Sequence, residues 1–103
     1  MKLVEYIGTA FYRGTVLRFK GKYPFTDEYT DFMIMDYPGC DEEQCPLALY
    51  CVSGYHAGSL EYVFPVEARS KDSVSIEKDW LIENWSKRIY GECNVDDVEI
   101  VIR

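Results

Sequence analysis

Hydrophobic and polar residues alternate along three stretches in the first part of the chain, and a period of two predicts β-strands. The stretches are residues 2–7, 14–20 and 29–37. In the third, Phe32 and Ile34 fall on one face, while Met33 and Met35 fall on the other. Each of these strands should therefore present two chemically distinct faces.

Two further strands are predicted before the pattern changes. Residues 47–52 (LALYCV) are nearly all apolar, which is typical of an interior strand covered on both sides. Residues 60–66 should return beside it after a hairpin connection that contains Gly54 and Gly58. Pro65 near the end of that stretch suits an edge position in the sheet or a bulge.

The period then lengthens to that of a helix. Leu81, Trp85 and Ile89 recur at spacings of four and should form its buried stripe. Ser75 is the predicted N-cap, and Gly91 is the predicted C-cap. Residues 95–102 alternate again and predict a terminal strand.

This order of elements predicts an α+β fold. We expect a mostly antiparallel sheet of five to six strands, with one long helix from the C-terminal half packed on one face and a final strand after the helix. The chain has 103 residues, 48% of them hydrophobic, and no linker divides it. A single domain over residues 1–103 is therefore expected.

Charge is distributed very unevenly. Residues 23–68 contain nine Asp and Glu and no Lys or Arg, whereas residues 1–22 contain five basic residues and one acidic residue. The negative electrostatic field of such an acidic stretch suits a cationic partner, because complementary charge speeds the encounter of two proteins and sets their relative orientation. Ordinary solubility is the alternative, since a net charge of -7 is normal for a small domain.

The same charge excludes some classes of partner. An acidic chain without a basic stripe argues against nucleic-acid binding, which depends on phosphate neutralisation, and anionic lipid would repel it. No apolar run has the length of a signal peptide or a transmembrane helix, which predicts a cytoplasmic protein. Its cysteines are then expected to be reduced.

Candidate chemistry centres on four cysteines and one histidine. Cys40, Cys45, Cys51 and His56 are spaced too widely for the short knuckles of structural zinc sites. Cys51 and His56 flank one turn, but no sequence typical of an oxyanion loop surrounds them. We therefore expect no catalytic residue, no metal site and no cofactor. A small enzyme that uses His56 and a metal-stabilised module remain as alternatives.

Residues 84–93 (NWSKRIYGEC), followed by VDDV at residues 95–98, provide a more specific signal. This segment resembles the C-terminal signature of the Immunity protein 45 family, whose members are encoded beside toxins of bacterial polymorphic and contact-dependent systems. The resemblance implies a non-enzymatic protein that binds one cognate toxin. It also implies scaffold roles for Trp85 in the core, Tyr90 at the end of the helix and Cys93 as a buried thiol.

An acidic immunity protein could fill the basic cleft of its toxin, and a nuclease is one class of toxin with such a cleft. Acidic residues, with aromatic neighbours that fill apolar pockets, are the candidate partner-binding residues. They are Asp36, Tyr37, Asp41, Glu42, Glu43, Tyr55, Asp96 and Asp97. The alternative is a stand-alone interaction or regulatory domain unrelated to toxins. The oligomeric state is open, with residues 60–66 and 95–102 as candidate edge strands.

Overall fold

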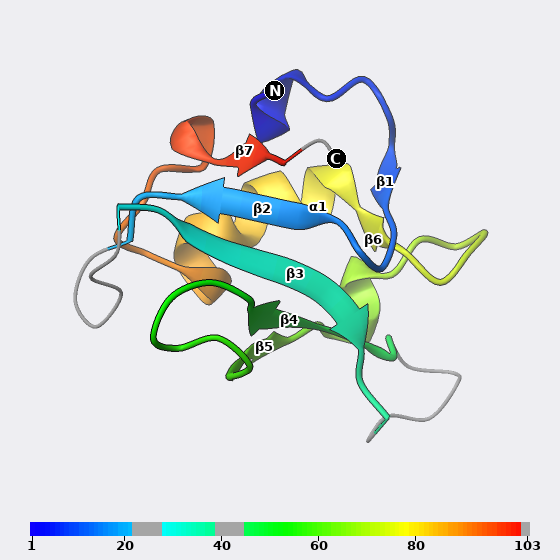
Figure 1. The fold of residues 1–103 in the computed structure, drawn as a ribbon. Coiled ribbons are helices and arrows are strands. Elements are labelled where there is room, and N and C mark those ends of the chain that lie inside the picture. The colour runs from blue at the N-terminus through cyan, green and yellow to red at the C-terminus, as the bar shows by residue number, and fades with distance from the viewer. Residues whose placement is uncertain (22–27, 39–44, 102–103) are drawn as a thin grey trace.

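The computed structural model describes residues 1–21, 28–38 and 45–101, and its main element is a five-stranded antiparallel sheet (Figure 1). The strand order is β5-β4-β3-β2-β7. The strands are β2 (Val16–Phe19), β3 (Thr30–Asp36), β4 (Leu47–Cys51), β5 (Leu60–Val63) and β7 (Glu99–Ile100). The predicted α+β class is confirmed. The two candidate edge segments do contain the two edge strands, β5 and β7.

One helical segment packs behind this sheet (Figure 1). Helix α1 (Lys78–Asn84) continues as a π-helical turn, Trp85–Ile89, which the amide of Tyr90 closes by donating to the Trp85 carbonyl at 2.8 Å. Leu81 and Trp85 are fully buried, and Ile89 packs against the core. The predicted helical stripe is therefore confirmed.

The strand register determines which side chains meet the helix. Leu17 lies opposite Phe32, and Phe32 lies opposite Cys51, so these three side chains share one face. The ring of Phe19, on the same face, lies 5.3 Å from the ring of Trp85 in an edge-to-face contact. The core thus forms between this face of the sheet and the helix.

The prediction of a strand over residues 2–7 is wrong. Leu3–Glu5 form a single 3-10 turn, and Lys2 makes only an isolated bridge to Glu99. The Leu3 amide donates to the Val98 carbonyl at 2.8 Å, and the Leu3 side chain is fully buried. The segment therefore turns its apolar residue into the core beside β7 instead of continuing along that edge.

The structure also contains a two-stranded sheet that the sequence did not predict. β1 (Ala10–Phe11) pairs antiparallel with β6 (Ile76–Glu77). Because β6 occupies the residues just before the helix, α1 begins at Lys78, and the predicted N-cap at Ser75 is wrong. The Ser75 hydroxyl instead shares a hydrogen bond of 2.8 Å with the Ser73 hydroxyl.

The ends of the last two predicted elements also differ from expectation. The π-helical turn is capped at Tyr90, and Gly91 lies just beyond it. Positive φ angles occur instead at Gly14, Gly54 and Gly58 among the described residues. The terminal strand is shorter than residues 95–102, because Val95–Asp97 form a 3-10 turn before β7. Nowhere in the described ranges is a helix long and apolar enough to cross a membrane.

Candidate functional site

The predicted binding residues are distributed over both ends of β3. Asp41, Glu42 and Glu43 lie outside the described residues. Asp36 ends β3 and pairs with Arg13 at 2.7 Å, with both side chains exposed. Tyr37 follows, half-buried, and its amide donates to the Pro46 carbonyl at 2.8 Å. At this end the carboxylate of Asp36 is thus already paired with a cation in water, which weakens its field.

Tyr55 lies at the other end of β3, in the connection between β4 and β5. This connection is a compact turn in which Gly54 and Gly58 adopt positive φ angles of 63° and 95°, and the Gly58 amide donates to the Cys51 carbonyl at 2.6 Å. The Tyr55 side chain is 94% exposed and touches the ring of His56 edge-on at 5.5 Å between centroids. An exposed tyrosine on a well-formed turn is available to a partner at little ordering cost.

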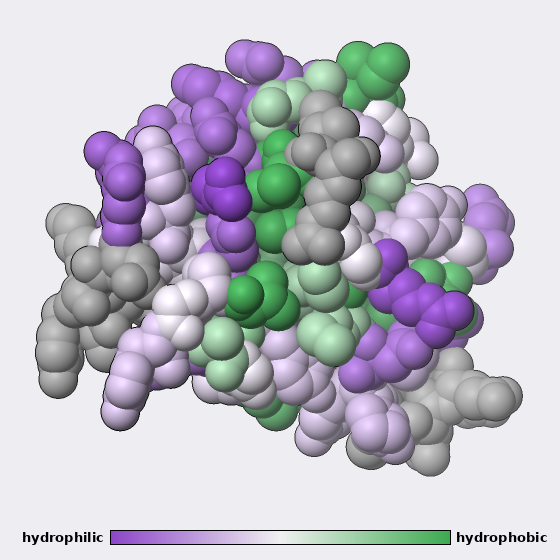
Figure 2. All heavy atoms as spheres, viewed as in Figure 1, coloured by the Kyte–Doolittle hydropathy of each residue, from purple (hydrophilic) through white to green (hydrophobic). Residues whose placement is uncertain are grey.

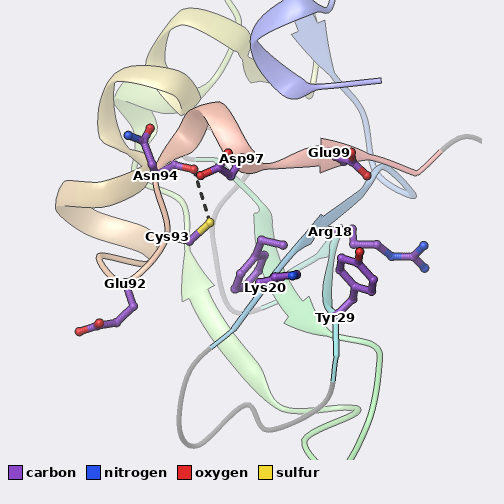
Figure 3. A pocket seen from close by; sticks show the side chains of 9 residues that line it. Arg18, Lys20, Tyr29, Glu92, Cys93, Asn94, Asp97 and Glu99 are labelled. Atoms are coloured by element: carbon purple, nitrogen blue, oxygen red, sulfur yellow. Dashed lines mark hydrogen bonds between the residues drawn. The ribbon is translucent and has the colours of Figure 1, made fainter.

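Asp96 and Asp97 lie in the 3-10 turn before β7, and both are exposed. The Asn94 side chain caps this turn by accepting the Asp96 amide at 3.0 Å. Asp97 also lines a hollow of about 440 Å³ between this turn, the end of β2 and the start of β3 (Figure 3). Its lining residues are Arg18, Phe19, Lys20, Tyr29, Glu92, Cys93, Asn94, Asp97 and Glu99.

Two of the lining residues, Arg18 and Glu99, belong to a ladder of alternating charges. Arg18 donates from Nε and Nη2 to the two carboxylate oxygens of Asp31, at 2.8 and 3.0 Å. On its other side Arg18 lies opposite Glu99, whose backbone in turn forms an isolated antiparallel β-bridge with Lys2. The hydrogen bonds and the charge of Asp31 raise the pKa of Arg18, and the guanidinium lies 5.8 Å from the centre of the Tyr29 ring. The sequence did not reveal this ladder, because it depends on the register of strands far apart in the chain.

The two thiols near the candidate residues, those of Cys51 and Cys93, are buried. Cys93 Sγ donates to the Asn94 carbonyl at 3.4 Å (Figure 3), and Cys51 Sγ donates to the Ser53 carbonyl at 3.3 Å. Burial raises the pKa of both thiols, which keeps them protonated and disfavours a nucleophilic thiolate. Among the described residues, which exclude Cys40, no three His, Cys, Asp or Glu side chains are grouped so as to hold a metal ion.

The structure therefore separates the candidate residues into two groups. Asp36 and Tyr37 lie at one end of β3, about 20 Å along the strand from its start at about 3.3 Å per residue. Tyr55 and Asp97 lie toward the other end, near Asp31. The amide of Val52, three residues before Tyr55, donates to the Asp31 carbonyl. Arg18 connects Asp31 to β7, which begins two residues after Asp97. No single patch brings all of the described candidates together.

Comparison with known families gives a clear result. The model of the Immunity protein 45 family matches residues 3–100, nearly the whole chain. The chain belongs to the Immunity protein 45 family. No curated protein and no solved structure matches it. The resemblance inferred from residues 84–98 is thus confirmed, and it extends over the preceding strands.

Within this member of the Immunity protein 45 family, the three signature residues all lie in or against the core. Trp85 is fully buried, and Cys93 is buried. The ring of Tyr90 lies 4.8 Å from the ring of Phe19 and closes the end of the helix over the sheet. Their positions agree with the scaffold roles that the resemblance implied. These three signature residues therefore attach the helix to the sheet. The only candidate binding residues within the signature are Asp96 and Asp97.

Proposed function

We propose that this protein binds a cognate bacterial toxin and neutralises it without catalysis, in the cytoplasm. Membership of the Immunity protein 45 family is the observation that carries this proposal. A family of immunity proteins implies a toxin as the partner. The raised pKa of the buried Cys51 thiol agrees with binding rather than nucleophilic chemistry.

Charge suggests how the toxin is recognised. The five strands of the main sheet contain the acids Asp31, Asp36, Glu61 and Glu99 but only one base, Arg18. The helical segment of residues 78–89 contains three bases and two acids. Negative charge is thus associated with the sheet, and we propose that the sheet side faces a basic surface of the toxin, such as the substrate cleft of a nuclease. Acidic groups would then raise the association rate and align the two proteins.

The candidate residues contribute to this surface in different ways. Asp96 and Asp97 provide exposed carboxylates on a capped turn, and Tyr55 provides an exposed ring. Asp36 and Tyr37 would contribute less, since Asp36 is already paired with Arg13. Asp41, Glu42 and Glu43 remain proposed contacts on the strength of their charge alone.

The decisive experiment is growth rescue. The product of the adjacent gene is expressed with and without this protein, and binding between the purified pair is measured at several salt concentrations. We expect rescue, together with binding that weakens as salt rises, because screening reduces attraction between exposed charges. A toxic neighbour that is neither bound nor neutralised would refute the proposal.

Charge reversal tests the acidic contacts. Replacing Asp41, Glu42 and Glu43 with lysine in one variant, and Asp96 and Asp97 in a second, should lower the association rate by about 10-fold or more at low salt and flatten its salt dependence. A matched control reverses Asp79 and Glu83, two exposed acids on α1, and should leave the rate nearly unchanged. Unchanged kinetics in either test variant would remove those residues from the interface.

A further inference from the structure

The five-stranded sheet has a second face, which the helix does not cover. Cross-strand register places Val16 opposite Met33, Met33 opposite Tyr50, and Tyr50 opposite Leu60. Directly opposed residues point to the same side of a sheet, so these four side chains form one apolar row across β2, β3, β4 and β5. The amide of Val101 donates to the Val16 carbonyl at 2.9 Å, which extends the row past the end of β7.

A second row lies beside the first. Met35 pairs with Ala48, and Ala48 pairs with Val63. We use the term open face for the larger side chains of the two rows. They are Val16, Met33, Met35, Tyr50, Leu60 and Val63.

The open face is separate from the main core. The buried core cluster consists of side chains such as Leu17, Phe32 and Trp85 from the helix side, and none of the six open-face residues belongs to it or packs against it. Figure 1 views the sheet with α1 behind it, and none of the described helices crosses the near side. Figure 2, from the same direction, shows hydrophobic side chains over the middle of β2 and β3 with hydrophilic ones around them.

This face remains accessible to another protein. Met35 is 39% exposed and Leu60 is 45% exposed, and Met33, Tyr50 and Val63 are half-buried, whereas Val16 at the β2 end of the row is buried. A contiguous exposed apolar surface with a polar rim is typical of a protein interaction site. Methionine is well suited to such a surface, because its flexible, polarisable side chain adapts to the shape of a partner.

The charges around the open face indicate what kind of surface would bind it. The ladder of Asp31, Arg18 and Glu99 crosses one end of the face, and Glu61 lies in β5 where the register with β4 shifts. Asp36 shares the helix side of β3 with Ile34 and is paired with Arg13, so Asp31, Glu61 and Glu99 are the strand acids that remain against the single strand base Arg18. A second copy of this chain would bring two acidic rims together, which is unfavourable. A partner with an apolar centre and a basic rim would be complementary in both respects.

We propose that the open face is the surface on which the toxin docks, with an apolar segment of the toxin against Met33, Met35 and Leu60 and basic side chains around that contact. This inference rests on the proposed function. It adds to that function the position of the interface and the chemistry of its centre. The acidic residues then guide approach, while the apolar rows supply most of the affinity, because buried apolar contacts at the centre of an interface dominate its energy.

The test uses single substitutions that place a charge on the open face. Met35→Glu and Leu60→Glu are compared with Val66→Glu, a control whose side chain is 53% exposed in the 3-10 turn Val66–Ala68, which packs on α1. Affinity for a catalytically inactive form of the adjacent gene's toxin is measured by calorimetry. We expect each open-face variant to bind about 100-fold more weakly, equivalent to about 2.7 kcal/mol, and the control to change less than about threefold.

Two further measurements sharpen the result. Met35→Lys should weaken binding more than Met35→Glu, because a lysine would also repel a basic rim. Thermal unfolding followed by circular dichroism should show that the variants remain folded, as expected for partly exposed positions.

Each outcome has a distinct meaning. If the wild-type protein neutralises the toxin but both open-face variants bind it as tightly as the control, the proposed function stands and the docking surface is wrong. If the wild-type protein does not bind the toxin, the proposed function itself fails. If sedimentation shows a dimer that Met35→Glu dissociates while toxin affinity is unchanged, a second copy covers this face and the inference is overturned.

Discussion

Trp85 should be the side chain whose loss most weakens the fold. Its indole is fully buried between the sheet and the helical segment, with ring centroids 5.3 Å from Phe19 and 6.5 Å from Phe32. Among the described residues, its Nε1–H has no hydrogen-bond partner. Two substitutions therefore separate the contribution of the ring from the cost of the unpaired donor. Trp85→Ala removes both, whereas Trp85→Phe keeps an aromatic ring and removes only the donor and part of the volume.

The two variants should differ clearly in stability. Replacing a buried tryptophan with alanine costs about 3–5 kcal/mol through lost transfer energy and the cavity that remains. A domain of this size has a free energy of unfolding of about 5–15 kcal/mol, so Trp85→Ala should lose a large part of it. An unsatisfied buried donor costs about 1–3 kcal/mol, and its removal in Trp85→Phe offsets part of the lost packing. We expect a net loss of about 1 kcal/mol for Trp85→Phe.

Urea unfolding followed by far-ultraviolet circular dichroism measures both free energies without relying on the fluorescence of the residue replaced. Trp80, which is retained in both variants and packs 6.4 Å from the ring of Tyr62, provides an independent fluorescence signal. If Trp85→Phe destabilises the protein as much as Trp85→Ala, the indole N–H contributes to the fold and the reasoning is refuted. A Trp85→Ala variant within about 1 kcal/mol of wild type would refute the burial argument.

Two other predictions concern the thiols and the histidine. Because burial raises the pKa of Cys51 and Cys93, the folded state holds these protons more tightly than the unfolded state, so stability should fall as the pH rises through about 8.5, the ordinary thiol value. Urea unfolding at pH 7 and 9.5 should show this fall in wild type and a smaller one in a Cys51→Ala, Cys93→Ala double variant; equal falls would contradict the assignment. His56→Ala should leave growth rescue intact, because binding does not require an acid–base group. Loss of rescue by a folded His56→Ala protein would instead favour an enzyme.

Local sequence patterns were sufficient to predict most of the regular elements. The strict alternation around Phe32 and Ile34 located β3, and the apolar run beginning at Leu47 located β4. The spacing of Leu81, Trp85 and Ile89 identified the helical stripe. These patterns succeed because a strand or helix must place its apolar side chains on one face at its own period. The family signature could also be read locally, since it lies within one helix end and the turn that follows.

Other features were decided only when distant parts of the chain came together. Residues 2–7 alternate like a strand, but the Leu3 amide pairs with Val98 and the segment turns into the core. Ser75 has a capping side chain, but pairing of Ile76 with Phe11 moved the helix start to Lys78. In both cases a contact with a remote partner outweighed the local preference.

The open face, too, depends partly on local sequence patterns and partly on contacts between distant residues. Alternation alone showed that Met33 and Met35 share a face, but it could not show which face of β3 the helix would cover. Register then aligned Met33 with Val16, Tyr50 and Leu60, and placed Arg18 between Asp31 and Glu99. The sequence alone determined the acidic character and the two-faced strands. Only the tertiary structure decided which face is buried and which is left for a partner, because that choice depends on contacts between residues with no local pattern in common.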